Sequence, residues 1–157
     1  MREKVTELFQ PDTSVNAVCL TTNGFVKEDN DMMRRVLVCG SRDFYDAKMI
    51  HNVLSRLPEH STIIEGEARG ADTHARIEGQ CLGFTIERYP ADWNEYGKAA
   101  GFIRNEEMIN SGVDEVIAFC SKQKLEDSRG TADTVRRARS KRIPVRVYYL
   151  NGKVESF

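Results

Sequence analysis

A regular alternation of short apolar segments with amphipathic segments, running from residue 35 to residue 150, constrains the fold of this chain most. The expected strands are Arg35–Cys39, Thr62–Glu65, Phe84–Tyr89, Glu115–Cys120 and Pro144–Leu150. The expected helices are a segment capped by Asp46 and running to Leu57, then Ala71–Leu82, Glu95–Asn110 and Gly130–Lys141. Such alternation requires right-handed crossovers, so it predicts an α/β fold with a mostly parallel sheet of about five strands and helices on both faces. The turn Asn151-Gly152 then predicts a C-terminal antiparallel edge hairpin.

The first 34 residues do not follow this alternation, and we interpret residues 1–34 as an appended N-terminal arm to a domain of residues 35–157. Weak helical spacing in residues 1–10 stops at Pro11, and the segments around Thr21–Gly24 indicate a small hairpin. We expect the arm to pair with a sheet edge or a second subunit. Together with the edge hairpin, this favours a homo-oligomer.

Composition excludes several partners. The net charge of −1 over 157 residues provides no global field for nucleic acid, so any anion site has to be local, and we do not expect a nucleic-acid partner. No apolar run approaches the length of a membrane span, so we expect no membrane partner and a cytoplasmic protein. The four cysteines are scattered without metal-ligand spacing; we expect no metal and no cofactor, and we regard Cys39, before a glycine turn, as a weak nucleophile candidate.

The residues that follow the strands predict one ligand site, because ligands of an open parallel sheet bind beyond the carboxyl ends of its strands. The first half of the expected ligand-binding set consists of Gly40, Ser41, Arg42, Gly66, Arg69, Gly70, Ala71 and Asp72. The second half consists of Asp92, Trp93, Gly101, Asn105, Ser128, Arg129, Gly130 and Thr131. Neither the dinucleotide fingerprint GxGxxG nor the phosphate loop GxxxxGK[ST] occurs.

Glycines, arginines and helix starts within this set point to a phosphate. Glycine lets a backbone approach a phosphate and arginine binds it bidentately, although Gly40–Arg42 is equally consistent with a plain tight turn. The N-terminus that begins at Gly130 is a further anion site. Asp72 accepts ribose hydroxyls or caps its helix, and Trp93 stacks on a base or covers the core.

Four stretches, residues 36–44, 63–72, 89–109 and 128–138, resemble in order and spacing the YspA-like branch of the SLOG superfamily. The resemblance implies a Rossmann-like three-layer sandwich that binds nucleotides or nucleotide-derived ligands. Members are often small and encoded by bacteria and their phages. The superfamily includes the Lonely Guy phosphoribohydrolases, which hydrolyse the N-glycosidic bond of cytokinin nucleotides, and the DNA-processing protein of natural transformation.

The resemblance also suggests catalytic residues. Residues 104–108 are similar to the hydrolases' R-K-x-x-M element, with asparagine in place of lysine. Residues 129–134 are similar to their G-G-x-G-T-x-E-E element, but Asp133 and Thr134 stand where the two glutamates are expected. Cleavage of an N-glycosidic bond passes through an oxocarbenium-like state that a carboxylate stabilises, so we assign Glu65, Arg104 and Asp133 as catalytic candidates.

Three functions follow as hypotheses. The first is a nucleotide-binding protein that hydrolyses the N-glycosidic bond of its ligand. The second is a non-catalytic sensor or sequestering protein for a nucleotide signal, for instance in phage–host conflict. The third is a DNA-binding module, which the near-zero net charge disfavours.

Overall fold

The computed structural model describes residues 19–20, 26–27 and 33–157, and the chain divides into two units, Met1–Met32 and Met33–Phe157. In the first unit, β1 (Cys19–Leu20) pairs antiparallel with β2 (Val26–Lys27), as the hairpin expected around Thr21–Gly24 requires. The helical spacing noted in residues 1–10 lies outside the described residues.

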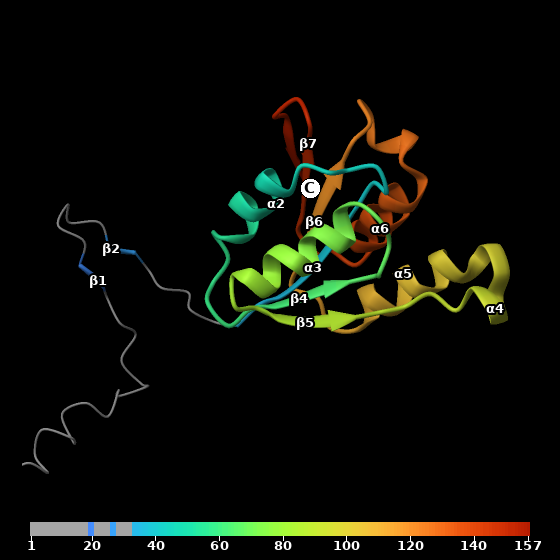
Figure 1. Ribbon diagram of the computed structural model, residues 1–157, viewed down its shortest axis with the longest axis horizontal. Coiled ribbons are helices and arrows are strands. Elements are labelled where there is room, and N and C mark those ends of the chain that lie inside the picture. The colour runs from blue at the N-terminus through green and yellow to red at the C-terminus, as the bar shows by residue number, and fades with distance from the viewer. Residues whose placement is uncertain (1–18, 21–25, 28–32) are drawn as a thin grey trace, which may run out of the picture. The chain divides into compact units, whose positions relative to one another are not determined.

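The second unit is built on a six-stranded sheet in the order β5-β4-β3-β6-β7-β8 (Figure 1). Its strands are β3 (Arg35–Gly40), β4 (Thr62–Glu65), β5 (Thr85–Arg88), β6 (Glu115–Cys120), β7 (Val145–Tyr149) and β8 (Val154–Ser156). The first five strands are parallel, and β8 alone pairs antiparallel, with β7. The predicted mostly parallel sheet with an antiparallel C-terminal edge is confirmed.

Three of the four predicted helices form close to their expected bounds. They are α2 (Ala47–Leu54), α3 (Ala71–Cys81) and α6 (Arg129–Ser140), and a short 3-10 turn, η2 (Leu125–Asp127), precedes α6. Asp46 caps α2, as predicted, because its Oδ1 accepts a 2.9 Å hydrogen bond from Met49 N–H.

The helical segment predicted over roughly Glu95–Asn110 forms and ends at Asn110, but it is interrupted. The segment folds instead as α4 (Trp93–Tyr96), a 3-10 turn η1 (Gly97–Ala99) and α5 (Ala100–Asn110). Gly97 has φ +52°, which ends α4 because a right-handed helix requires negative φ. Among the described residues, no helix is long and apolar enough to cross a membrane.

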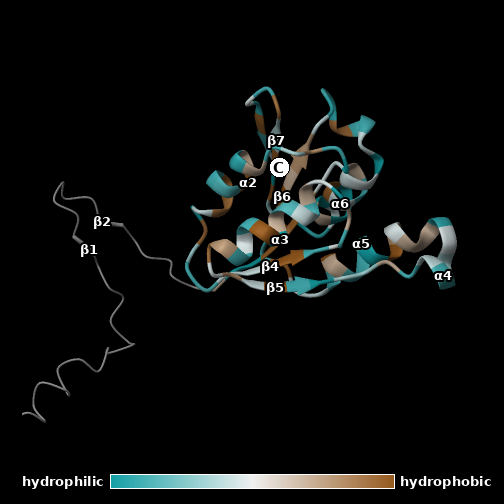
Figure 2. Cartoon of the chain, viewed as in Figure 1, coloured by the Kyte–Doolittle hydropathy of each residue, from teal (hydrophilic) through white to brown (hydrophobic). Residues whose placement is uncertain are grey.

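Helices cover the sheet from both sides, which gives the three-layer α/β sandwich. On one face, Ile50, Val53 and Leu54 of α2 pack with α3 against Val36, Val38 and Ile63. On the other face, α5 and α6 pack against alternate residues of the same strands. Figure 2 shows the hydrophobic colour on the inner strands β4 and β6 and hydrophilic residues toward the outer surface.

The strand order places a crevice beside β3. Strand β3 lies between β4 and β6, and the chain leaves β3 through α2 towards β4 but leaves β6 through α6 towards β7. The loops after β3 and β6 therefore diverge at the carboxyl edge of the sheet, and such a switch point is where Rossmann-like folds bind their ligands.

Candidate functional site

A cavity of about 660 Å³ lies at this carboxyl edge, between the loops after β3, β4 and β6 and the starts of α5 and α6. Most predicted ligand-binding residues line it, namely Gly40, Ser41, Arg42, Arg69, Asp72, Trp93, Gly101, Asn105, Ser128, Arg129, Gly130 and Thr131, together with the catalytic candidate Arg104. The predicted residues Glu65, Gly66, Gly70, Ala71, Asp92 and Asp133 do not line this cavity. Their positions are described below.

The loops after β3 and β4 touch at main-chain distance. Gly70 has φ +74°, and a Cβ there would overlap the carbonyl oxygens of Ser41 and Arg42. The next residue, Ala71, donates its N–H to Ser41 O at 3.2 Å and packs against Gly40. Gly70 and Ala71 therefore hold two loops together at the start of α3, while the side chains beside them line the cavity.

Arg104 reaches the cavity floor from α5. It is only 9% exposed, and its Nη1 donates to the carbonyl oxygen of Gly66 while its Nε donates to Asn105 Oδ1 at 3.1 Å. A Cβ at Gly66 would overlap the guanidinium, so the absence of a side chain there lets Arg104 lie against the backbone. Within the described residues, Arg104 Nη2 forms no hydrogen bond, which leaves it available to an anion in the cavity.

Asp72 is the most deeply buried carboxylate that lines the cavity. It is 3% exposed at the start of α3, and its Oδ2 accepts a 2.9 Å hydrogen bond from Gly66 N–H. Burial raises the pKa of Asp72 to about 7, although the positive charge of Arg104 and the Gly66 N–H act against this shift. The group therefore titrates near neutral pH in a place that a ligand can reach.

A chain of hydroxyls leads to the N-terminus of α6. Ser121 N–H donates to Ser41 Oγ at 3.1 Å, Ser41 Oγ lies 3.1 Å from Ser128 Oγ, and Ser128 Oγ lies 2.9 Å from Thr131 Oγ1. In the described part of the chain, no side chain caps the first N–H groups of α6. The hydroxyls and the helix start thus face the cavity together, as an oxyanion requires.

The lining also contains charged and aromatic residues that the sequence analysis did not select, namely Asp43, Tyr45, Lys98, Phe102, Lys122 and Asp127. Of the charged side chains in the lining, six are cationic (Arg42, Arg69, Lys98, Arg104, Lys122 and Arg129) and three are acidic (Asp43, Asp72 and Asp127). The ring of Tyr45 is 65% exposed, that of Trp93 50% and that of Phe102 45%. Tyr45 and Phe102 belong to an exposed turn and a helix start, where an exposed aromatic residue is itself the signal of a binding surface.

Glu65 points away from the cavity. It is fully buried between α3 and β5, with its Oε1 3.7 Å from Arg76 Nη1 and 3.6 Å from Arg88 Nε. Burial raises the pKa of Glu65, and the Glu67 N–H, which donates to Oε2 at 2.6 Å, opposes that shift. Glu65 is the buried centre of an ion cluster whose two arginines are partly exposed, and this cluster lies beside the loop after β4.

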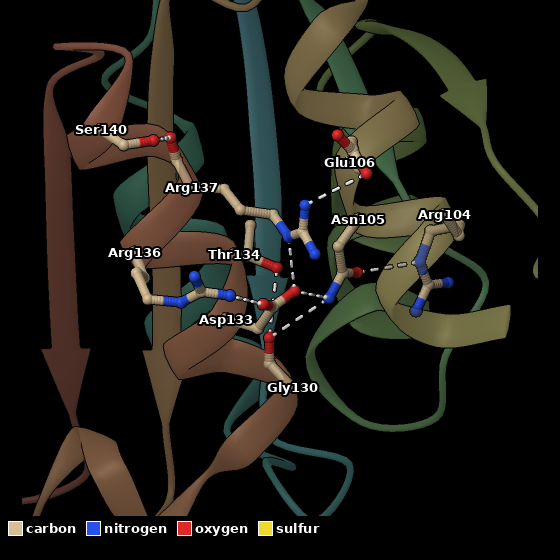
Figure 3. A network of polar contacts seen from close by, with 9 residues as sticks. All are labelled: Arg104, Asn105, Glu106, Gly130, Asp133, Thr134, Arg136, Arg137 and Ser140. Carbon is tan, nitrogen blue, oxygen red and sulfur yellow. Dashed lines mark hydrogen bonds and ion pairs between the residues drawn. The ribbon is translucent and has the colours of Figure 1, made fainter. Parts of the chain in front are cut away.

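Asp133 is enclosed by a polar network on α6 (Figure 3). Its carboxylate accepts hydrogen bonds from Arg136 Nη2 at 2.5 Å, Arg137 Nε at 2.8 Å and Asn105 Nδ2 at 3.2 Å. Burial raises the pKa of Asp133, but the bonds from Arg137, Asn105 and Arg136 outweigh burial and leave the pKa below its ordinary value. Asn105 thereby connects Asp133 to Arg104.

Two further predicted residues have defined places. Asp92 caps α4, since its Oδ1 accepts a 2.9 Å hydrogen bond from Glu95 N–H. Trp93 begins that helix, and the Arg42 guanidinium carbon lies 5.9 Å from its ring centroid, a cation–π arrangement. Its half-exposed ring does not cover the core.

The remaining chemistry of the cavity is limited. Cys39 lines it, but burial strongly raises the pKa of its thiol, with Asp72 adding to the shift, so the thiolate is disfavoured. Within residues 33–157 and the two short strands before them, no three His, Cys, Asp or Glu side chains are grouped to hold a metal ion.

Comparisons with known proteins agree with this architecture. Residues 34–96 match the model of the YspA, cpYpsA-related SLOG family. The Gene 61 protein of Mycobacterium phage D29 is 39% identical over 124 residues, an alignment that covers 72% of this chain and 94% of the phage protein.

Among solved structures, DNA processing protein A (DprA) from Streptococcus pneumoniae superposes with a TM-score of 0.57 at 17% identity. The match covers 95% of this chain and 66% of the DprA chain, and at this identity it supports the fold alone. The matched stretch and the phage relative together show that the chain belongs to the YspA, cpYpsA-related SLOG family, with a Rossmann-like fold of the kind that binds nucleotide-derived ligands.

Proposed function

We propose that the protein binds a phosphorylated, nucleotide-derived ligand in the cavity at the carboxyl edge of its sheet. The observation that carries this proposal is Arg104, a guanidinium that is nine-tenths buried and faces the cavity with Nη2 unpaired among the described residues. Burying such a charge is costly unless an anion or a dense set of acceptors compensates it. The guanidinium is held in place by Gly66 O and Asn105 Oδ1, so it is oriented before the ligand arrives.

The phosphate is placed at the N-terminus of α6. Uncapped N–H groups, the positive end of the helix dipole and the hydroxyls of Ser128 and Thr131 meet there. Six cationic side chains against three acidic ones in the lining give a local positive field, although the whole chain has a net charge of −1.

We assign the base to the exposed aromatic residues Trp93 and Phe102. Trp93 and Phe102 are about half exposed on the α4–α5 side of the cavity, where an exposed aromatic residue offers surface to a planar ligand. Stacking of one base on an aromatic ring contributes about 1–3 kcal/mol. Asp72, at the start of α3, supplies an acceptor for ribose hydroxyls.

Binding is tested by isothermal titration calorimetry with the four common nucleoside 5′-monophosphates. Arg104→Ala should weaken binding by about tenfold to a hundredfold, since a hydrogen bond to a charged group contributes about 1.5–3 kcal/mol. Arg56→Ala is the matched control, because Arg56 is an exposed arginine that does not line the cavity. If both variants bind every nucleotide as the wild type does, the phosphate is not held here.

A second candidate function is hydrolysis of the ligand's N-glycosidic bond, and Asp72 is the observation that favours it. Asp72 lines the cavity with a pKa of about 7, whereas Glu65 and Asp133 are enclosed in ion pairs outside it. A protonated Asp72 donates its proton to the departing base as the bond from C1′ to nitrogen breaks. Water then adds to C1′ and gives one proton back to the Asp72 carboxylate, which leaves a sugar phosphate and restores the acid.

Chromatography for free base separates this reaction from simple binding. If the protein hydrolyses its ligand, the wild type releases base and Asp72→Asn does not, while calorimetry shows that both bind. If the wild type binds nucleotide and releases no base, the protein is a non-catalytic binder, as a sensor or a sequestering protein of a nucleotide signal would be. A non-catalytic sensor or sequestering protein is compatible with the relative encoded by a phage.

A further inference from the structure

A second cavity, of about 380 Å³, adjoins the first. The two cavities share five lining residues, Arg42, Ala68, Arg69, Trp93 and Arg104. The second cavity then continues past them, away from α6, between the loop after β4 and the segment after β5. Each cavity falls within the size range of about 300–1,000 Å³ that is typical of small-molecule sites.

The boundary between the cavities is strongly cationic. Arg42, Arg69 and Arg104 line both cavities, and the Arg42 guanidinium stays close to the Trp93 ring at 5.9 Å. The start of α6 is not part of the second cavity, so these arginines form an anion-binding position separate from the helix start. A mononucleotide whose single phosphate is shared between Arg104 and the start of α6 leaves Arg42 and Arg69 unused.

The lining of the second cavity fits a nucleoside. Pro90, Ala91 and Trp93 provide apolar and aromatic surface, and Glu67, whose Oε1 is paired with Arg88, provides a carboxylate that is 28% exposed. A flat base needs such apolar surface, and a ribose or an exocyclic amino group donates to a carboxylate. The boundary arginines lie between this surface and the first cavity.

We propose that the natural ligand is a phosphate-bridged dinucleotide, with one nucleoside in each cavity and a bridging phosphate at Arg42, Arg69 and Arg104. This inference rests on the proposed function, since it assigns the ligand class of the same site. The first nucleoside occupies the larger cavity with its own phosphate at α6. The second nucleoside lies against Pro90 and Ala91.

The test fills the second cavity and leaves the first intact. Ala91→Trp adds a large side chain to a half-buried lining position that belongs to the second cavity and not to the first. Thr85→Trp is the matched control, because Thr85 is exposed at the start of β5 and lines neither cavity. Calorimetry with wild type and both variants uses AMP, the linear dinucleotide pApA and pyrophosphate-bridged diadenosine, with the guanosine equivalents in parallel.

We expect the wild type to bind one of the two dinucleotides at least about tenfold more tightly than the monophosphate, a difference of about 1.4 kcal/mol. Ala91→Trp should remove that preference and bind the monophosphate as the wild type does, while Thr85→Trp keeps it. The better of the two dinucleotides identifies the bridge as a phosphodiester or a pyrophosphate. If monophosphates bind and neither dinucleotide binds more tightly, or if Ala91→Trp keeps the preference, the two-cavity inference fails alone. If no nucleotide binds at all, the proposed function fails with it.

Discussion

Replacing Gly130 with aspartate should strengthen α6 and at the same time exclude an anion from its N-terminus. Gly130 lines the cavity in the first turn of α6, and a Cβ added there meets no atom within 4 Å. A negative charge in the first turn is favourable to the helix dipole by about 0.3–1 kcal/mol. Replacing a helical glycine with alanine contributes about 0.5–1 kcal/mol, and aspartate, a weaker helix former than alanine, recovers part of that amount. The ligand-free variant should therefore unfold at a higher urea concentration than the wild type.

The same carboxylate opposes a bound phosphate. Two unit negative charges about 5 Å apart at an effective dielectric constant of about 20 repel each other by about 3 kcal/mol, which corresponds to a loss of affinity of more than about a hundredfold. Gly130→Ala is the matched control, since it adds the Cβ and the helix propensity without the charge. Calorimetry at low salt measures binding, and urea unfolding of the ligand-free proteins measures stability.

If the phosphate lies at α6, Gly130→Asp should raise the stability of the protein and lower its affinity for nucleotide. A general disturbance of the fold would lower both quantities together. If Gly130→Asp binds nucleotide as tightly as Gly130→Ala, the phosphate does not lie at α6, and its position has to be assigned again from the arginines alone.

Other predictions concern the loops, the buried carboxyl and the tryptophan. Gly83→Ala should lower the free energy of unfolding by about 1–2 kcal/mol, because Gly83 has positive φ. Gly70→Ala should lower it by more, because Gly70 also has positive φ and a Cβ there would in addition overlap the Ser41 backbone. Urea unfolding of the two variants measures the difference. The pKa of Asp72 is raised from 3.8 to about 7, so the folded state keeps the carboxyl proton to higher pH than the unfolded state. The contribution of the protonated carboxyl to the free energy of unfolding is therefore full below about pH 4 and is lost as pH rises through 7. Asp72→Asn keeps the acceptor for Gly66 N–H, so melting curves between about pH 5 and pH 8 should show wild type losing stability relative to the variant; parallel curves would contradict the raised pKa. Trp93 is the single tryptophan of the chain, so its emission should change as nucleotide saturates the site, and constant emission would place the base elsewhere.

The strands were predictable because each combines a short apolar run with an abrupt end. Thr62–Glu65 and Glu115–Cys120 form with the predicted bounds, and the Asn151-Gly152 turn leads into β8 as expected. The interruption of the helical segment predicted over Glu95–Asn110 was not foreseen, because Gly97 adopts positive φ, a backbone conformation that amphipathic spacing does not encode.

The site was predictable to the level of loops and less so to the level of side chains. Parallel strands bring their carboxyl ends to one edge, so the cluster around Gly40, Arg69 and Gly130 follows from the fold. The side chain of Glu65 points to the same face of the sheet as that of Ile63, because the two residues are two apart in one strand, and Ile63 packs in the α2–α3 layer. Only the observed crossover shows that this face is turned away from the cavity.

The two walls of the cavity are built very differently. On one side, Gly40 and Gly70 let neighbouring segments pack at main-chain distance, and Gly66 lets the Arg104 guanidinium lie against the backbone, so that wall cannot move without loss of close contacts. On the other side, α4 and η1 contain no buried residue. One wall of the cavity is therefore rigid, and the other is free to adjust. We therefore expect the glycine side to select the shape of a ligand and residues 93–99 to adjust to ligands of different size. Amide hydrogen exchange on ligand binding should then slow most in that short segment.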